Sequence, residues 1–135
     1  MIFRLSAIAL ALAAAGPALA GDAAKGEADF PKKCKSCHAI VAEDGTEIVK
    51  GGKTGPNLFG IVGKPVASSD FKYGDGILAA QAAGAVWDEA ALAAYVADPG
   101  RWLKEVTGDG KVKTKMTFKL PKGNDDMAAY LATLQ

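Results

Sequence analysis

The clearest amphipathic pattern lies at the end of the chain. Met127, Tyr130, Leu131 and Leu134 recur at i, i+3, i+4 and i+7, which is the apolar stripe of a helix. Asn124 is placed to cap this helix, and two aspartates follow it in the first turn. We therefore expect a C-terminal helix with Met127 in the core.

A second helix is predicted over Trp87–Val96. Acidic residues stand near its start, and Leu92, Tyr95 and Val96 fall on one face. The sequence Asp98-Pro99-Gly100 then predicts its end.

The remaining segments predict shorter helices separated by loops. Asp22 is placed to cap a first helix over Ala23–Phe30, which Pro31 should end because proline has no N–H and clashes with the preceding turn. Short helices are also expected over Asp75–Ala83 and Arg101–Val106, and loops over Thr46–Asn57 and Val62–Gly76. No segment shows sustained strand alternation, so we predict an all-α fold of three to five helices with long loops.

Composition limits the chain to one small domain. It has 135 residues, of which 50% are hydrophobic and 23% charged, so disorder and collagen-like structure are excluded. Residues 1–20 combine Arg4, an apolar run over Leu5–Ala15 and a final Ala-Leu-Ala. This pattern predicts a cleaved secretory signal peptide, because a membrane span needs roughly 20 apolar residues. The domain is then 21–135, outside the cytoplasm and without a membrane span.

The chemistry concentrates in one pentapeptide. Both cysteines and the only histidine lie in Cys34-Lys35-Ser36-Cys37-His38, the C-x-x-C-H pattern of covalent haem attachment. Two thiols at this spacing can each add to a porphyrin vinyl group, and the adjacent imidazole can bind the iron. A thioredoxin-like pair would need a βαβ context, and a zinc site would need about four ligands. A plain disulfide would leave the position of His38 unexplained.

The other axial ligand of the iron is either absent or a methionine. There is no second histidine, and Met127 is assigned to the core. Met116 lies in a basic, β-branched segment between Gly110 and Pro121 that predicts a loop, and we expect it to bind the iron. His/Met ligation raises the reduction potential, which suits an electron carrier. An open site would instead indicate a haem enzyme or a gas-binding protein, and a haem-free disulfide or binding module is the third alternative.

The order of motifs adds a family resemblance. The set is Gly26, Phe30, Cys34–His38, Thr54–Leu58, Trp87, Tyr95, Lys113–Phe118 and Tyr130. With these residues the chain resembles class I cytochrome c, and most closely bacterial cytochrome c2 of the large subtype and its relatives from denitrifying bacteria. The segment between His38 and Thr54 and the loop before Thr114 are longer than in mitochondrial members.

The resemblance implies roles for individual residues. Cys34 and Cys37 would hold one haem c, with His38 and Met116 as its axial ligands. The Pro56 carbonyl would accept a hydrogen bond from His38, and Tyr95 would lie near the Met116 sulfur. The residues implied to bond the haem propionates are Tyr73, Trp87 and Thr114. Gly26 and Phe30 would pack the first helix against Met127 and Tyr130.

The resemblance also implies a function without a transformed substrate. It implies a monomeric periplasmic carrier that takes electrons from a quinol-oxidising bc-type complex. The acceptor is a photosynthetic reaction centre, a terminal oxidase or a denitrification enzyme, and the residues leave this choice open.

Charge is balanced overall but segregated along the chain. Lys and Arg number 16 and Asp and Glu 15, so nothing points to nucleic acid as a partner. The segments Pro31–Pro65 and Pro99–Lys122, which hold the expected iron ligands, carry +3 and +5. We expect their lysines to form a docking face for acidic redox partners. These are Lys32, Lys33, Lys35, Lys50, Lys53, Lys111, Lys113, Lys115, Lys119 and Lys122.

Overall fold

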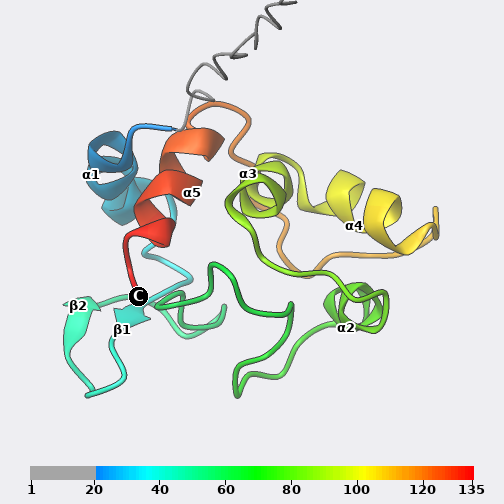
Figure 1. The fold of residues 1–135 in the computed structure, drawn as a ribbon, viewed down its shortest axis with the longest axis horizontal. Coiled ribbons are helices and arrows are strands. Elements are labelled where there is room, and N and C mark those ends of the chain that lie inside the picture. Colours follow the sequence, from blue (N-terminus) through cyan, green and yellow to red (C-terminus); the bar gives the residue numbers. More distant parts are fainter. Residues whose placement is uncertain (1–20) are drawn as a thin grey trace, which may run out of the picture.

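Five helices and one small hairpin make up the fold in a computed structural model that describes residues 21–135 (Figure 1). The helices are α1 (Ala23–Lys33), α2 (Asp75–Ala82), α3 (Glu89–Ala97), α4 (Pro99–Thr107) and α5 (Asn124–Ala132). The strands are β1 (Ile40–Val41) and β2 (Glu47–Val49), paired antiparallel. The predicted signal peptide lies outside the described residues. Among residues 21–135 we find no helix with the length and apolar character needed to cross a bilayer.

The packing of α1 on α5 brings together the two ends of the domain (Figure 1). Gly26 lies at the contact, and a Cβ there would come within 2.1 Å of the Asp126 carbonyl oxygen. Phe30 meets Tyr130 edge to face, with ring centroids 6.0 Å apart. Met127 is only 1% exposed, which confirms its place in the core.

The buried side chains form two clusters rather than one. The first joins α1, α3 and α5 through Phe30, Leu92 and Leu131, and the second joins α3 and α4 through Tyr95 and Trp102. Small domains usually have one contiguous core. In residues 21–135 the two clusters share only half-buried neighbours, Trp87 and Val96.

Helix α1 runs past the point where we expected it to end. It continues through Pro31 to Lys33, so the prediction that Pro31 interrupts it is wrong. Pro31 and Glu27 are both exposed, so the carbonyl that loses its helical donor can face water. The last turn is held instead by Cys34 and Lys35, whose N–H groups donate to the Phe30 carbonyl at 2.9 and 3.1 Å. The expected cap at Asp22 is confirmed by its bonds to the Ala24 and Lys25 N–H groups.

Other boundaries also differ from the prediction. Helix α3 begins after Asp88, which accepts a hydrogen bond from Ala91 N–H at 2.7 Å, so Trp87 precedes the helix. Asn124 does not cap α5, because its side chain donates to the Ala93 carbonyl of α3 and Gly123 takes the cap position. Helix α4 extends further than expected, from Pro99 to a left-handed Gly108.

The β1–β2 hairpin was not predicted, and β2 falls inside an expected loop. Ile40 pairs with Val49, and the turn includes Gly45 at a φ of 87°. Strands of two and three residues are too short to show alternation. The fold is nevertheless helical, as predicted, with long loops between α1 and α3.

Candidate functional site

The C-x-x-C-H segment begins where α1 ends and turns sharply. The Cys37 and His38 N–H groups both donate to the Cys34 carbonyl, at 3.1 and 2.9 Å. This turn ties the backbone of Cys37 and His38 to that of Cys34. The cysteines are free, with Cys34 half-buried and Cys37 exposed.

The Cys34 thiol does not have the property expected of a reactive redox cysteine. Burial, helped by the neighbouring Cys37 and by Asp29, raises the pKa of Cys34 to about 11. Redox-active C-x-x-C cysteines instead have lowered pKa values, because the thiolate is the reactive form. Cys34 is therefore a protonated thiol at neutral pH.

The His38 ring is held in one orientation. Its Nδ1 lies 2.8 Å from the Pro56 carbonyl oxygen, which can only accept, so Nδ1 is the protonated nitrogen. Burial lowers the pKa of His38, and the bond to Pro56 opposes this only in part. The imidazole is therefore neutral near pH 7 and has its lone pair on Nε2, the form that binds a metal.

A glycine-rich loop, residues 51–55, packs closely against the C-x-x-C-H segment, and we call this contact the clasp. Gly52 N–H donates to the Lys35 carbonyl at 2.9 Å and Gly55 N–H to the Cys37 carbonyl at 2.8 Å. A Cβ on Gly55 would lie 2.3 Å from His38 Cε1, and one on Gly51 would lie 1.9 Å from the His38 carbonyl oxygen. Glycine is thus required by close approach here. The sequence showed the glycines but not that they cover the pentapeptide.

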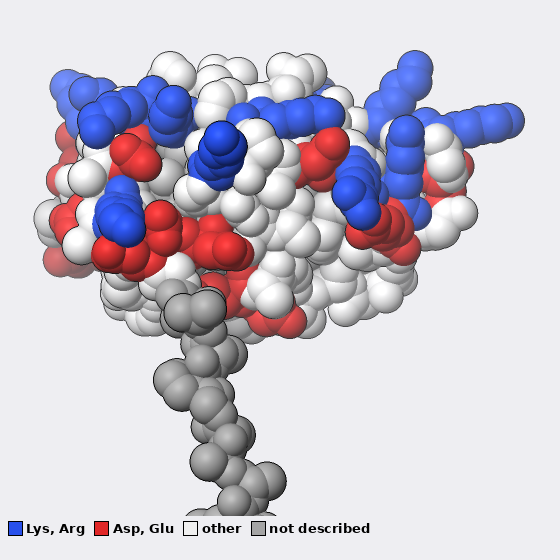
Figure 2. Space-filling model, turned by 90° about the horizontal axis from the view of Figure 1, so that it is seen from above, with Lys and Arg blue, Asp and Glu red and all other residues white. Residues whose placement is uncertain are grey.

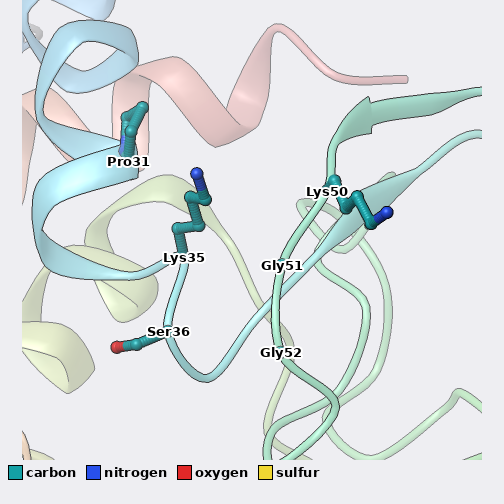
Figure 3. A pocket seen from close by; sticks show the side chains of 6 residues that line it. All are labelled: Pro31, Lys35, Ser36, Lys50, Gly51 and Gly52. Atoms are coloured by element: carbon teal, nitrogen blue, oxygen red, sulfur yellow. The ribbon is translucent and has the colours of Figure 1, made fainter.

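The crossing of the two segments leaves a shallow surface pocket of about 500 Å³ (Figure 3). Lys35 and Ser36 border it on the pentapeptide side, and Lys50 borders it on the glycine-loop side. This pocket is on the surface of the clasp and does not contain His38.

Met116 packs against the second core cluster, whereas Cys34 packs against the first. Met116 is half-buried, and the cluster against which it packs includes Tyr95 of α3 and Trp102 of α4. The Thr114 hydroxyl donates to the Met116 carbonyl at 3.0 Å and accepts from its N–H at 3.1 Å. The Thr114 hydroxyl therefore holds the Met116 loop, and its implied bond to a propionate stays a prediction. Burial raises the pKa of Tyr95, so its hydroxyl stays protonated.

Three aromatic rings pack together in the second core cluster and beside it. Trp87 stacks on Trp102 with centroids 4.9 Å apart, and Tyr95 lies 5.0 Å from Trp87 and 5.4 Å from Trp102. Trp102 was not predicted to belong to the site. Tyr95 and Trp102 meet because α3 ends before Asp98 and α4 begins a new helix after it, so their spacing in the sequence does not predict the contact.

Tyr73 and Trp87, both implied to bond a propionate, line one cavity of about 250 Å³. Lys64 and Ser69 line the same cavity and were not predicted. The Tyr73 hydroxyl pairs with Ser69. Thr114 does not line this cavity.

The residues present fit a covalently held haem better than any other cofactor considered. Each core cluster is bordered by half-buried apolar side chains, and a flat apolar group could cover these side chains. Leu58 and Ile61 border the first cluster, Ile77 and Met116 border the second, and Val96 borders both. The donor set is the two cysteine sulfurs, one neutral imidazole and one thioether. No group of three His, Cys, Asp or Glu suited to a metal ion occurs within 21–135, so a zinc site has no support there.

The lysines of the expected docking face are exposed. Figure 2 shows Lys and Arg side chains gathered toward one edge of the molecule and acidic side chains gathered mostly toward the other. Two of the lysines are paired: Lys119 lies 2.8 Å from Asp98 and Lys32 lies 3.4 Å from Asp29. The charge separation expected from the sequence is therefore visible on this surface.

Comparison with known proteins gives the family. No protein-family model matches the chain. It is 57% identical over 130 residues to cytochrome c2 of Rhodobacter capsulatus, covering 96% of this chain and 94% of that protein. It is 61% identical over 115 residues to cytochrome c-550 of Paracoccus pantotrophus, covering 83% and 85%. Ferric cytochrome c-550 from Paracoccus versutus superposes with a TM-score of 0.80 at 59% identity, over 84% of this chain and 98% of that one. The chain, with its clasped C-x-x-C-H segment, therefore belongs to the class I cytochrome c family, in its bacterial cytochrome c2 branch.

Proposed function

We propose that this haem c electron-transfer protein is a periplasmic one-electron shuttle whose iron is held between His38 and Met116. The observation that carries the proposal is the fixed His38 ring, with Nδ1 on the Pro56 carbonyl and Nε2 left for a metal. The proposed shuttle is the mature chain 21–135, released from its signal peptide, and it works as a monomer.

Each group of residues would have a separate role in holding the haem. Cys34 and Cys37 would bind the haem covalently, and the glycine loop would keep the pentapeptide in place. When bound, the haem supplies a one-electron Fe(III)/Fe(II) couple. Thr114 would fix the Met116 loop through its two bonds to the Met116 backbone, and the apolar residues of both clusters would exclude water. Ligands retained in both oxidation states need little reorganisation, which favours fast electron transfer over substrate chemistry.

The partners proposed are membrane redox complexes. A bc-type quinol oxidoreductase would reduce the protein, and a reaction centre, terminal oxidase or denitrification enzyme would oxidise it. The exposed lysines, Lys113 and Lys115 among them, would attract acidic surfaces of these complexes. Such redox contacts are small and short-lived.

Mass spectrometry of the protein from the host periplasm tests the attachment. The expected product begins at Gly21 and carries the mass of one haem. Cys34→Ser and Cys37→Ser should each lose one covalent bond, and Ser36→Ala, between them, should leave the attachment intact. A mature protein without haem mass would refute the proposal.

Electron transfer is tested separately with the purified protein. Reduction by the host's bc-type complex and reoxidation by each candidate acceptor should both be fast at low ionic strength and slow down as salt is added. Turnover of peroxide or tight binding of a diatomic gas by the wild type would favour the open-site alternative.

A further inference from the structure

The Asn57 side chain makes an unusual set of contacts for an exposed residue. Its Oδ1 accepts a hydrogen bond from Val41 N–H at 2.9 Å, and its Nδ2 donates to the Val41 carbonyl at 2.8 Å. Oδ1 also accepts from Phe59 N–H at 3.1 Å. The amide therefore grips both backbone groups of one residue in β1, the strand that begins just after His38.

This grip acts on the peptide group that touches His38. The Pro56 carbonyl belongs to the planar peptide joining Pro56 to Asn57, so anchoring Asn57 restricts the direction of that carbonyl. Pro56 has no N–H of its own through which it could be anchored. The neighbouring backbone bonds, from Gly55 to Cys37 and from Leu58 to Ala39 at 3.2 Å, hold the loop on either side of this peptide.

We infer that Asn57 is a positioning residue for His38: its grip on Val41 holds the Pro56 carbonyl against Nδ1. The inference rests on the proposed function, in which Nε2 binds the haem iron. A strong bond at Nδ1–H increases the electron donation of an imidazole ligand and fixes its orientation. Asn57 thereby stabilises the ferric form and lowers the reduction potential, without touching the haem.

Asn57→Ala tests the inference, with Asn124→Ala as its matched control. The control also removes an asparagine side chain that donates to a backbone carbonyl, at 3.3 Å, but it lies between α5 and α3. Each loss should lower the denaturant midpoint modestly, because one or more hydrogen bonds are lost. Only Asn57→Ala should shift the reduction potential upward and speed solvent exchange of the His38 Nδ1 proton in the reduced protein, followed by NMR.

The outcomes separate this inference from the proposed function. A wild type without haem, or without His38 on the iron, would refute the function itself. A haem-loaded Asn57→Ala protein with wild-type potential and wild-type proton exchange would overturn the inference alone. If Asn57→Ala does not hold haem, Asn57→Gln decides. Its longer side chain cannot keep both bonds to Val41 with the backbone in place, so wild-type values in both measurements would again overturn it.

Discussion

Replacing Gly26 by alanine tests the close contact between α1 and α5. Gly26 is buried where α1 meets α5, and the two helices tie the start of the domain to its end. An added Cβ would lie 2.1 Å from the Asp126 carbonyl oxygen and 2.7 Å from Tyr130 Cβ. Ordinary contact begins at 3.4 Å, so the side chain cannot be accommodated without movement.

The size of the effect follows from two opposing contributions. Alanine favours a helix over glycine by about 1 kcal/mol. Overpacking costs about 1–3 kcal/mol, and here the high end applies because the obstacle is helix backbone. Separating the helices also weakens the Phe30–Tyr130 ring pair, worth about 1 kcal/mol. We expect Gly26→Ala to lower the free energy of unfolding by about 2–3 kcal/mol.

The assay is equilibrium denaturation of the haem-loaded protein, with Gly100→Ala as the control. Gly100 also lies in a helix, but a Cβ there would be 3.7 Å from its nearest neighbour, an oxygen of Asp98. This variant should match or exceed wild-type stability, by up to about 1 kcal/mol. If Gly26→Ala proved as stable as Gly100→Ala, the close approach of α1 and α5 would be refuted.

Three further predictions concern the ligand, the docking face and acid stability. Met116→Ala should let the ferrous protein bind carbon monoxide rapidly. Met127→Ala should still prevent carbon monoxide from reaching the iron, but it should lower the free energy of unfolding by about 2–5 kcal/mol. Equal carbon monoxide binding by the two variants would contradict the assignment of Met116 as the ligand. Lys113→Glu should slow reaction with an acidic partner several-fold at low salt and flatten the salt dependence, whereas Lys104→Glu on α4 should change little, and equal effects would count against a localised docking face. The hydrogen bond from Lys119, and after it the bond from Arg101 N–H, lowers the pKa of Asp98 below its ordinary value of 3.8. The stabilisation by the Asp98 charge is therefore present above pH 3.8 and is lost as the pH falls below that value, through the lowered pKa. The excess stability of wild type over Asp98→Asn, measured in urea, should therefore disappear in acid, and a pH-independent difference would contradict this assignment.

Local sequence patterns predicted the elements whose signals are local. The cap at Asp22, the helix containing Leu92 and Tyr95, and the burial of Met127 all depend on residues within a few positions of one another. The family resemblance, confirmed by the comparisons, added the order of these elements around a haem-binding pentapeptide.

The wrong or missing predictions concern features that depend on the folded surroundings of a residue and not on its neighbours in the sequence. Asn124 has a good capping side chain, but α3 offers it the Ala93 carbonyl instead. Pro31 is a helix breaker in isolation, yet its exposed position lets α1 continue. The clasp of Gly55 on His38 and the stacking of Trp102 on Trp87 also arise only in the folded chain, so no local pattern predicts them.

The most direct test of the account is the near-infrared absorption of the purified ferric wild-type protein at neutral pH. A methionine sulfur bound to ferric haem iron gives a weak charge-transfer band there, and the account predicts that band. A folded, haem-loaded protein without the band would show that Met116 does not bind the iron and would contradict a carrier whose two axial ligands stay in place.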